Sequence, residues 1–148
     1  MSTEVNKAAA MEVLERAFNQ GDLSAIDQYI AADGVDHQEP EGTDIRRHLK
    51  EVTTNLRTGY PDLHFELHEI LADGDIVSFR ATMTGTHTGP LRTAMGRAVP
   101  PTGRKVSVAH MYFLRFVDGK NTDLWHIWDT PAMLQQLGIV PQMQAQPN

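Results

Sequence analysis

The spacing of hydrophobic residues changes once along the chain and divides it into a helical part and a strand-rich part. Up to Gly59, apolar residues recur every three or four positions, as they do in amphipathic helices. This period predicts a helix over residues 3–18, a second from Asp22 to Ile30, and a third that is capped by Thr43 or Asp44 and ends at Gly59. From Tyr60 onward the apolar period becomes two, which predicts strands.

The strand-rich part contains four alternating runs, which are joined by turns and one long loop. The predicted strands cover residues 63–71, 77–84, 104–117 and 122–128. A slip of the pattern near Ile70 and Leu71 predicts a bulge in the first of them. Glycines and prolines interrupt residues 85–103, which are predicted to form a long loop, and residues 35–37 form a short extended segment. Helices followed by antiparallel strands make an α+β domain.

The strand predicted over residues 104–117 is apolar on both faces, which is typical of a strand in the middle of a sheet. One face carries Val106, Val108, His110, Tyr112, Leu114 and Phe116, and the other carries Ala109, Met111 and Phe113. Asp118-Gly119 supplies a tight turn. The returning strand ends at Asp129, immediately before Thr130-Pro131, where a short helix begins.

The length and charge of the chain limit the kinds of partner it can have. A chain of 148 residues is enough for one domain, which we expect to cover 1–140, with a flexible tail over 141–148. The net charge is −6, and the 13 lysines and arginines are scattered along the chain. Because no basic stripe follows from this pattern, we expect no nucleic acid as a partner.

The sequence also restricts the chemistry and the location of the protein. It contains no cysteine, which excludes disulfides, thiolate nucleophiles and zinc–thiolate sites. The seven histidines show no spacing that is typical of metal ligands, so we expect no metal. Residues 1–7 are polar, and no apolar run approaches the ~18 residues that span a bilayer. We therefore expect a cytoplasmic protein with no membrane partner.

Several short motifs lie in a consistent order over most of the chain. They are Asn19-Gln20-Gly21-Asp22, Val35-Asp36-His37, Tyr60-Pro61-Asp62-Leu63, Thr84-Gly85-Thr86-His87-Thr88-Gly89, Pro100-Pro101-Thr102-Gly103, Trp125-x-x-Trp128-Asp129 and Leu134-x-x-Leu137-Gly138. Together they resemble the SnoaL-like polyketide cyclases of the NTF2-like superfamily, which also contains ketosteroid isomerase. The resemblance implies a cone: a curved antiparallel sheet closed by three N-terminal helices over a deep pocket.

The resemblance also implies an assembly and a reaction. It implies a homodimer through the outer face of the sheet, which suits the apolar Ala109, Met111 and Phe113. The related cyclases close a polyketide ring by an intramolecular aldol reaction and use no cofactor or metal. By resemblance, this chain is a cofactor-independent enzyme that acts α to a carbonyl group of a small hydrophobic ligand. The alternatives are an isomerase similar to ketosteroid isomerase and a non-catalytic protein that binds a small hydrophobic molecule.

Two residues are the main catalytic candidates. The resemblance places Asp129 where the cyclases carry their acid/base aspartate, but an aspartate before Thr-Pro is also a common helix cap. His110 lies on the apolar face of the central strand with Tyr112, and the two can donate to a developing enolate oxygen. The alternative is that His110 and Tyr112 are core residues whose polar atoms are satisfied.

The substrate-binding candidates come from three other segments. His37 falls where the isomerases carry their general base, and its alternative is a surface loop residue. His126 and Trp128 lie on one face of the last strand, and Trp125 and Asp129 lie on the other. The residues alone leave open which face lines the pocket, and the resemblance favours the face with Trp125 and Asp129. Phe79 or Arg80 lines the pocket, depending on the face of its own strand.

Overall fold

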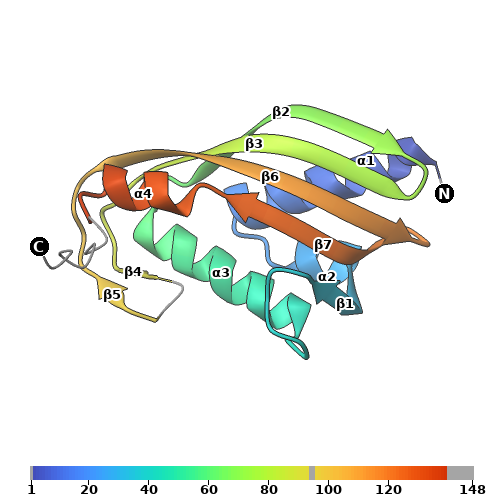
Figure 1. Ribbon diagram of the computed structural model, residues 1–148, viewed down its shortest axis with the longest axis horizontal. Helices are drawn as coiled ribbons and strands as arrows, with labels where there is room; N and C mark the ends of the chain where they lie inside the picture. The colour runs from blue at the N-terminus through green and yellow to red at the C-terminus, as the bar shows by residue number, and fades with distance from the viewer. Residues whose placement is uncertain (1, 94–95, 140–148) are drawn as a thin grey trace, which may run out of the picture.

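The structure, a computed structural model, describes residues 2–93 and 96–139 and contains a curved sheet with helices on its inner side (Figure 1). The predicted tail over 141–148 lies outside the described residues. The helical elements are α1 (Thr3–Glu12), η1 (Val13–Asn19), α2 (Ser24–Tyr29), α3 (Ile45–Gly59) and α4 (Thr130–Gln136). The strands are β1 (Ile30–Asp36), β2 (His64–Asp73), β3 (Ile76–Thr86), β4 (Leu91–Arg92), β5 (Ala98–Val99), β6 (Lys105–Val117) and β7 (Lys120–Trp128).

Strand β6 occupies the middle of the main sheet, as its pattern predicted. The strand order is β1-β7-β6-β3-β2, and all neighbours are antiparallel except β1 and β7, which are parallel. Buried and exposed residues alternate along the whole of β6. Its even-numbered residues face the interior, where α1, η1 and α3 cover the sheet, and its odd-numbered residues form the outer face.

The predicted first helix changes its hydrogen-bonding pattern before it ends. It is α-helical only to Glu12 and continues as a π-helix, η1, to Asn19. The widened turn is held from outside the helix. Arg57 donates to the carbonyl oxygens of Phe18 and Asn19 at 2.9 and 2.8 Å, and the Asn19 side chain bonds both backbone groups of Phe65. Tertiary partners therefore satisfy backbone groups that a local helix pattern would leave unpaired.

Three further features of the fold differ from the sequence prediction. Strand β1 begins at Ile30 and includes Val35 and Asp36 of the predicted extended segment but not His37, because parallel pairing with β7 overrides the helical spacing there. The bulge in β2 lies between Leu67 and Glu69 rather than near Ile70. The predicted loop over 85–103 contains a small hairpin, β4 and β5, which the Asn55 side chain holds to α3 by bonding both backbone groups of Arg92.

A second bulge sets the orientation of β7. After the turn, Val117 pairs with Lys120 and Phe116 pairs with Asn121, but Arg115 pairs with Asp123. Thr122 is therefore the extra residue. The buried Asn121 side chain holds the bulge, since its Nδ2 donates to the carbonyl oxygens of Arg115 and Asp123 at 2.9 and 2.8 Å. As a result, His126 pairs with Tyr112, and Trp128 pairs with His110.

None of the helices in the described part of the chain is long and apolar enough to cross a membrane.

Candidate functional site

A cavity of about 740 Å³ lies between the inner face of the sheet and the helices. Most of its wall is apolar and comes from α1, η1, α3, α4 and the sheet. Two groups of its polar side chains have members in close contact with one another. We call His110, Tyr112 and His126 on the sheet the inner cluster. We call Asp36, Glu39 and His48, which come from β1, the following loop and α3, the carboxylate–histidine cluster.

Cross-strand pairing arranges the inner cluster in two rows of rings. In the first row, Tyr112 stacks between Phe79 and His126, with ring centroids 4.4 and 4.0 Å apart. In the second row, His110 stacks on Trp128 at 5.1 Å, and the small Ala81 is its partner on β3. Because each row joins directly paired residues of neighbouring strands, the strand register fixes which rings meet.

The polar edges of these rings contact one another. His110 Nδ1 lies 2.9 Å from His126 Nε2 and 3.4 Å from the Tyr112 hydroxyl. In either tautomer, one imidazole donates to the other. The second nitrogen of His110, Nε2, is buried and has no hydrogen-bond partner within the described residues. A buried polar atom without a partner costs stability.

Burial keeps all three groups of the inner cluster neutral. Burial, followed by repulsion from His126, lowers the pKa of His110 to about 3. Burial lowers the pKa of His126 to about 4 and raises the pKa of the Tyr112 phenol above its ordinary value. At neutral pH the cluster therefore offers neutral imidazole and phenol groups. Such groups donate hydrogen bonds well, whereas imidazoles with so low a pKa are weak bases.

The carboxylate–histidine cluster contributes to the wall of the same cavity. His48 Nε2 lies 2.6 Å from Glu39 Oε1 and 3.9 Å from Asp36 Oδ2. Asp36 is buried, and its Oδ1 accepts from the backbone N–H of Gln38 at 3.0 Å. Within the described residues, these three are the group whose ligand atoms lie close enough, within 4.8 Å of one another, to hold a metal ion. An imidazole and two carboxylates would suit a divalent ion that prefers nitrogen and oxygen ligands.

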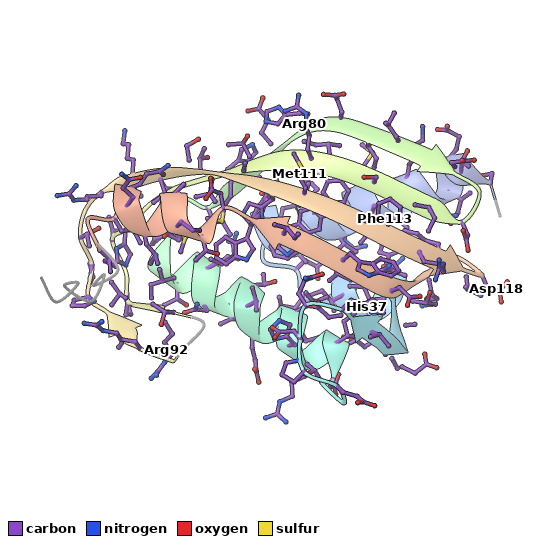
Figure 2. All side chains as sticks on the ribbon, viewed as in Figure 1. His37, Arg80, Arg92, Met111, Phe113 and Asp118 are labelled. Carbon is purple, nitrogen blue, oxygen red and sulfur yellow. The ribbon has the colours of Figure 1, made fainter. Side chains whose placement is uncertain are left out.

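The structure brings only part of the predicted site together. Phe79, His110 and Tyr112 line the cavity, whereas His37, Trp125 and Asp129 do not. His37 stacks on Trp125 with ring centroids 4.3 Å apart, and its Nε2 contacts Asp123 at 2.9 Å. Figure 2 shows His37 and Arg92 toward opposite ends of α3. The prediction that the Trp125 and Asp129 face of β7 lines the cavity is wrong, because the bulge turns His126 and Trp128 inward.

Asp129 caps helix α4, which was the alternative to a catalytic role for this residue. Its Oδ1 accepts from the backbone N–H of Ala132 at 3.1 Å, at the start of α4. Phe79 rather than Arg80 faces inward, and Arg80 pairs with Glu69 on the outer face.

The residues of the two clusters that were not assigned to the site from the sequence include His126, His48 and Glu39. His126 was placed on the rejected face of its strand, and a correct register would have brought it opposite Tyr112. His48 and Glu39 carried no motif. The only signal for His48 was its position next to Leu49 on the apolar side of the third helix, which is too common to indicate a site.

Comparison with known proteins agrees with this geometry. The sequence profile of the SnoaL-like polyketide cyclase family matches residues 8–137, which is most of the chain. No curated protein matches the chain.

Solved structures of similar sequence share the fold. AclR, a candidate hydroxylase from Streptomyces galilaeus, is 33% identical with a TM-score of 0.78, over 95% of this chain and 89% of AclR. IdmH, a candidate polyketide cyclase from Streptomyces antibioticus, is also 33% identical, with a TM-score of 0.73 over 90% of this chain and 98% of IdmH. A candidate polyketide cyclase from Bacillus cereus is 27% identical, with a TM-score of 0.78 over 95% and 87% of the two chains. With its α+β cone and internal cavity, the chain belongs to the SnoaL-like polyketide cyclase family of NTF2-like fold.

Proposed function

We propose that the protein is a cofactor-independent enzyme that forms an enolate α to a ketone, as an aldol cyclase does. The inner cluster holds the carbonyl oxygen of a small hydrophobic substrate and donates hydrogen bonds to it as negative charge develops. The observation that carries this proposal is the convergence of His110, His126 and Tyr112, all neutral and within 3.4 Å of their neighbours, in a cavity whose wall is mostly apolar. Fixed donors in such a site favour the enolate over the ketone.

The polar side chains of the inner cluster in the cavity wall favour a site that holds a polar atom over a purely hydrophobic binding pocket. A pocket for an apolar molecule needs no polar wall, and burying polar groups there lowers stability. Here one row of the sheet places an imidazole and a phenol side by side, and a second imidazole lies in the next row. The volume of about 740 Å³ is large enough for a ligand of several fused rings.

The proposal can be tested with a simple ketone and a mimic of its enolate. The ketone 2-tetralone carries acidic protons next to its carbonyl, and 2-naphthol has the flat shape and hydroxyl of the corresponding enol. We expect the protein to bind 2-naphthol and to accelerate exchange of the α-protons of 2-tetralone for deuterium in D₂O, which proton NMR measures. Binding of 2-naphthol without accelerated exchange would instead support the non-catalytic binding protein.

The substitution Asp129→Asn tests the predicted acid/base role of Asp129. Asparagine caps a helix about as well as aspartate, so the free energy of unfolding should change by less than about 1 kcal/mol. Because Asp129 does not line the cavity, we expect the deuterium exchange rate to stay near that of the wild type. Denaturant unfolding and the NMR exchange assay measure the two effects. A large loss of exchange in a stably folded variant would restore Asp129 as the acid/base.

We also propose that the protein is a homodimer through the outer face of the sheet. This face exposes apolar side chains on neighbouring strands: Met111 is 62% exposed, Phe113 47% and Ile127 70% (Figure 2). Contiguous apolar surface of this kind is typical of protein interfaces. Met111 and Phe113 are, with Ala109, the residues that suit the interface implied by the family resemblance.

The substitution Met111→Lys should disrupt this dimer, because it places a charge in the centre of the apolar face. We expect light scattering at micromolar concentration to give the mass of a dimer for the wild type and of a monomer for the variant. The matched control is Glu66→Lys, at an exposed position of β2. A monomeric wild type would contradict the proposal.

A further inference from the structure

We propose that His48 is the general base of this cavity and that Glu39 and Asp36 orient it. The inference rests on the proposed function, to which it adds the proton acceptor. The inner cluster supplies donors for the carbonyl oxygen, but its imidazoles are held neutral by burial, which makes them poor proton acceptors. A reaction α to a carbonyl needs a separate base.

The contacts of His48 define which of its nitrogens can accept a proton. Glu39 Oε1, at 2.6 Å, and Asp36 Oδ2, at 3.9 Å, both lie near Nε2. The negative charge of the two carboxylates favours the proton on Nε2, which leaves the lone pair of the neutral ring on Nδ1. No hydrogen bond of the described residues involves Nδ1. A histidine whose far nitrogen is held by a carboxylate is the usual arrangement of a positioned base.

His48 reaches the cavity wall from the helical side, whereas the donors lie on the sheet. His48 lies on α3, one turn after the cap residue Asp44, whereas the inner cluster lies on β6 and β7. Figure 1 shows α3 and these strands as separate layers, and the cavity between them is lined by both. In this proposal the ketone oxygen contacts the inner cluster, and its α-carbon faces His48.

The proton balance of the step is simple. The C–H bond α to the carbonyl breaks, its electron pair enters the enolate, and the proton moves to His48 Nδ1. The resulting imidazolium is next to two carboxylates, which offset its charge. The proton later returns to carbon or, in D₂O, is replaced by a deuteron. No oxidant, reductant or further reactant takes part.

The experiment compares exchange and binding in matched variants. We expect His48→Gln to slow the α-exchange of 2-tetralone by about 10²–10⁴-fold, the usual contribution of a positioned base. Binding of 2-naphthol should be unchanged, because the donors remain. His64→Gln makes the same substitution at an exposed position of β2 and should exchange like the wild type. Likewise, Glu39→Gln should slow exchange, whereas Glu41→Gln in the same loop should not.

Chemical rescue separates a catalytic role from a structural one. Imidazole added to His48→Ala should accelerate exchange of the ketone more than the same imidazole does in buffer without protein. A merely structural role of His48 would not allow this rescue. If the wild type accelerates exchange and His48→Gln exchanges at the same rate, this inference is overturned and the proposed function stays intact. Loss of wild-type exchange in EDTA would overturn it too, since the three residues would then be metal ligands. A wild type that does not accelerate exchange would end both proposals.

Discussion

The protein should lose roughly 3 kcal/mol or more of its free energy of unfolding as the pH falls from 6.5 to 4, because it buries two neutral imidazoles. In the folded state the pKa of His126 is about 4 and that of His110 is about 3, against 6.5 for an ordinary histidine. Between these values the unfolded chain binds protons that the folded protein excludes. The free energy of unfolding is therefore highest above pH 6.5, decreases as the pH falls below 6.5, and stops decreasing once the pH is below the folded-state values.

Each histidine contributes about 1.4 kcal/mol for every pH unit between its unfolded and folded pKa, so the slope is steep. Denaturant unfolding at a series of pH values measures it. We expect His126→Gln to have a shallower slope than the wild type, because one buried imidazole is removed. His64→Gln, at an exposed strand position, is the control and should keep the wild-type slope. Equal slopes in all three proteins would show that burial of the neutral pair does not govern the acid response.

The substitution Tyr112→Phe should slow the α-exchange of 2-tetralone by about 10²–10³-fold, the effect of removing one donor from an oxyanion site. Phenylalanine keeps the ring that stacks between Phe79 and His126. The lost hydroxyl makes one long contact, 3.4 Å from His110 Nδ1, so the fold should tolerate its removal. Binding of 2-naphthol should weaken as well, because the same hydroxyl contacts the ligand oxygen in this proposal.

The control for this variant is Tyr29→Phe, which removes a hydroxyl from the cavity wall at α2, away from the stacked rings. It should exchange and bind like the wild type. The three-way comparison distinguishes the donor role from a general change in the polarity of the cavity. Normal exchange in Tyr112→Phe would exclude the phenol as a donor and leave the two imidazoles as the remaining candidates.

The α+β class, the central position of β6 and most of the element boundaries could be predicted from the sequence. These features depend on local periods, turns and caps, which a single segment contains in full. The alternation along residues 104–117 placed His110 and Tyr112 on the inner face, because side chains of a strand alternate whatever its partners are. The capping role of Asp129 could likewise be predicted from its neighbours Thr130 and Pro131.

Only the tertiary structure decided which residues complete the site. A regular hairpin from the turn at 118–119 would set Trp125 opposite Tyr112, and one extra residue in β7 replaces it with His126. The inserted residue is held by Asn121, whose hydrogen bonds reach across to Arg115. A shift by one residue exchanges the two faces of a strand, so a local pattern cannot assign the face until its pairing is known. The Asp36, Glu39 and His48 cluster depends in the same way on contacts between β1, a loop and α3, which no single segment of the sequence contains.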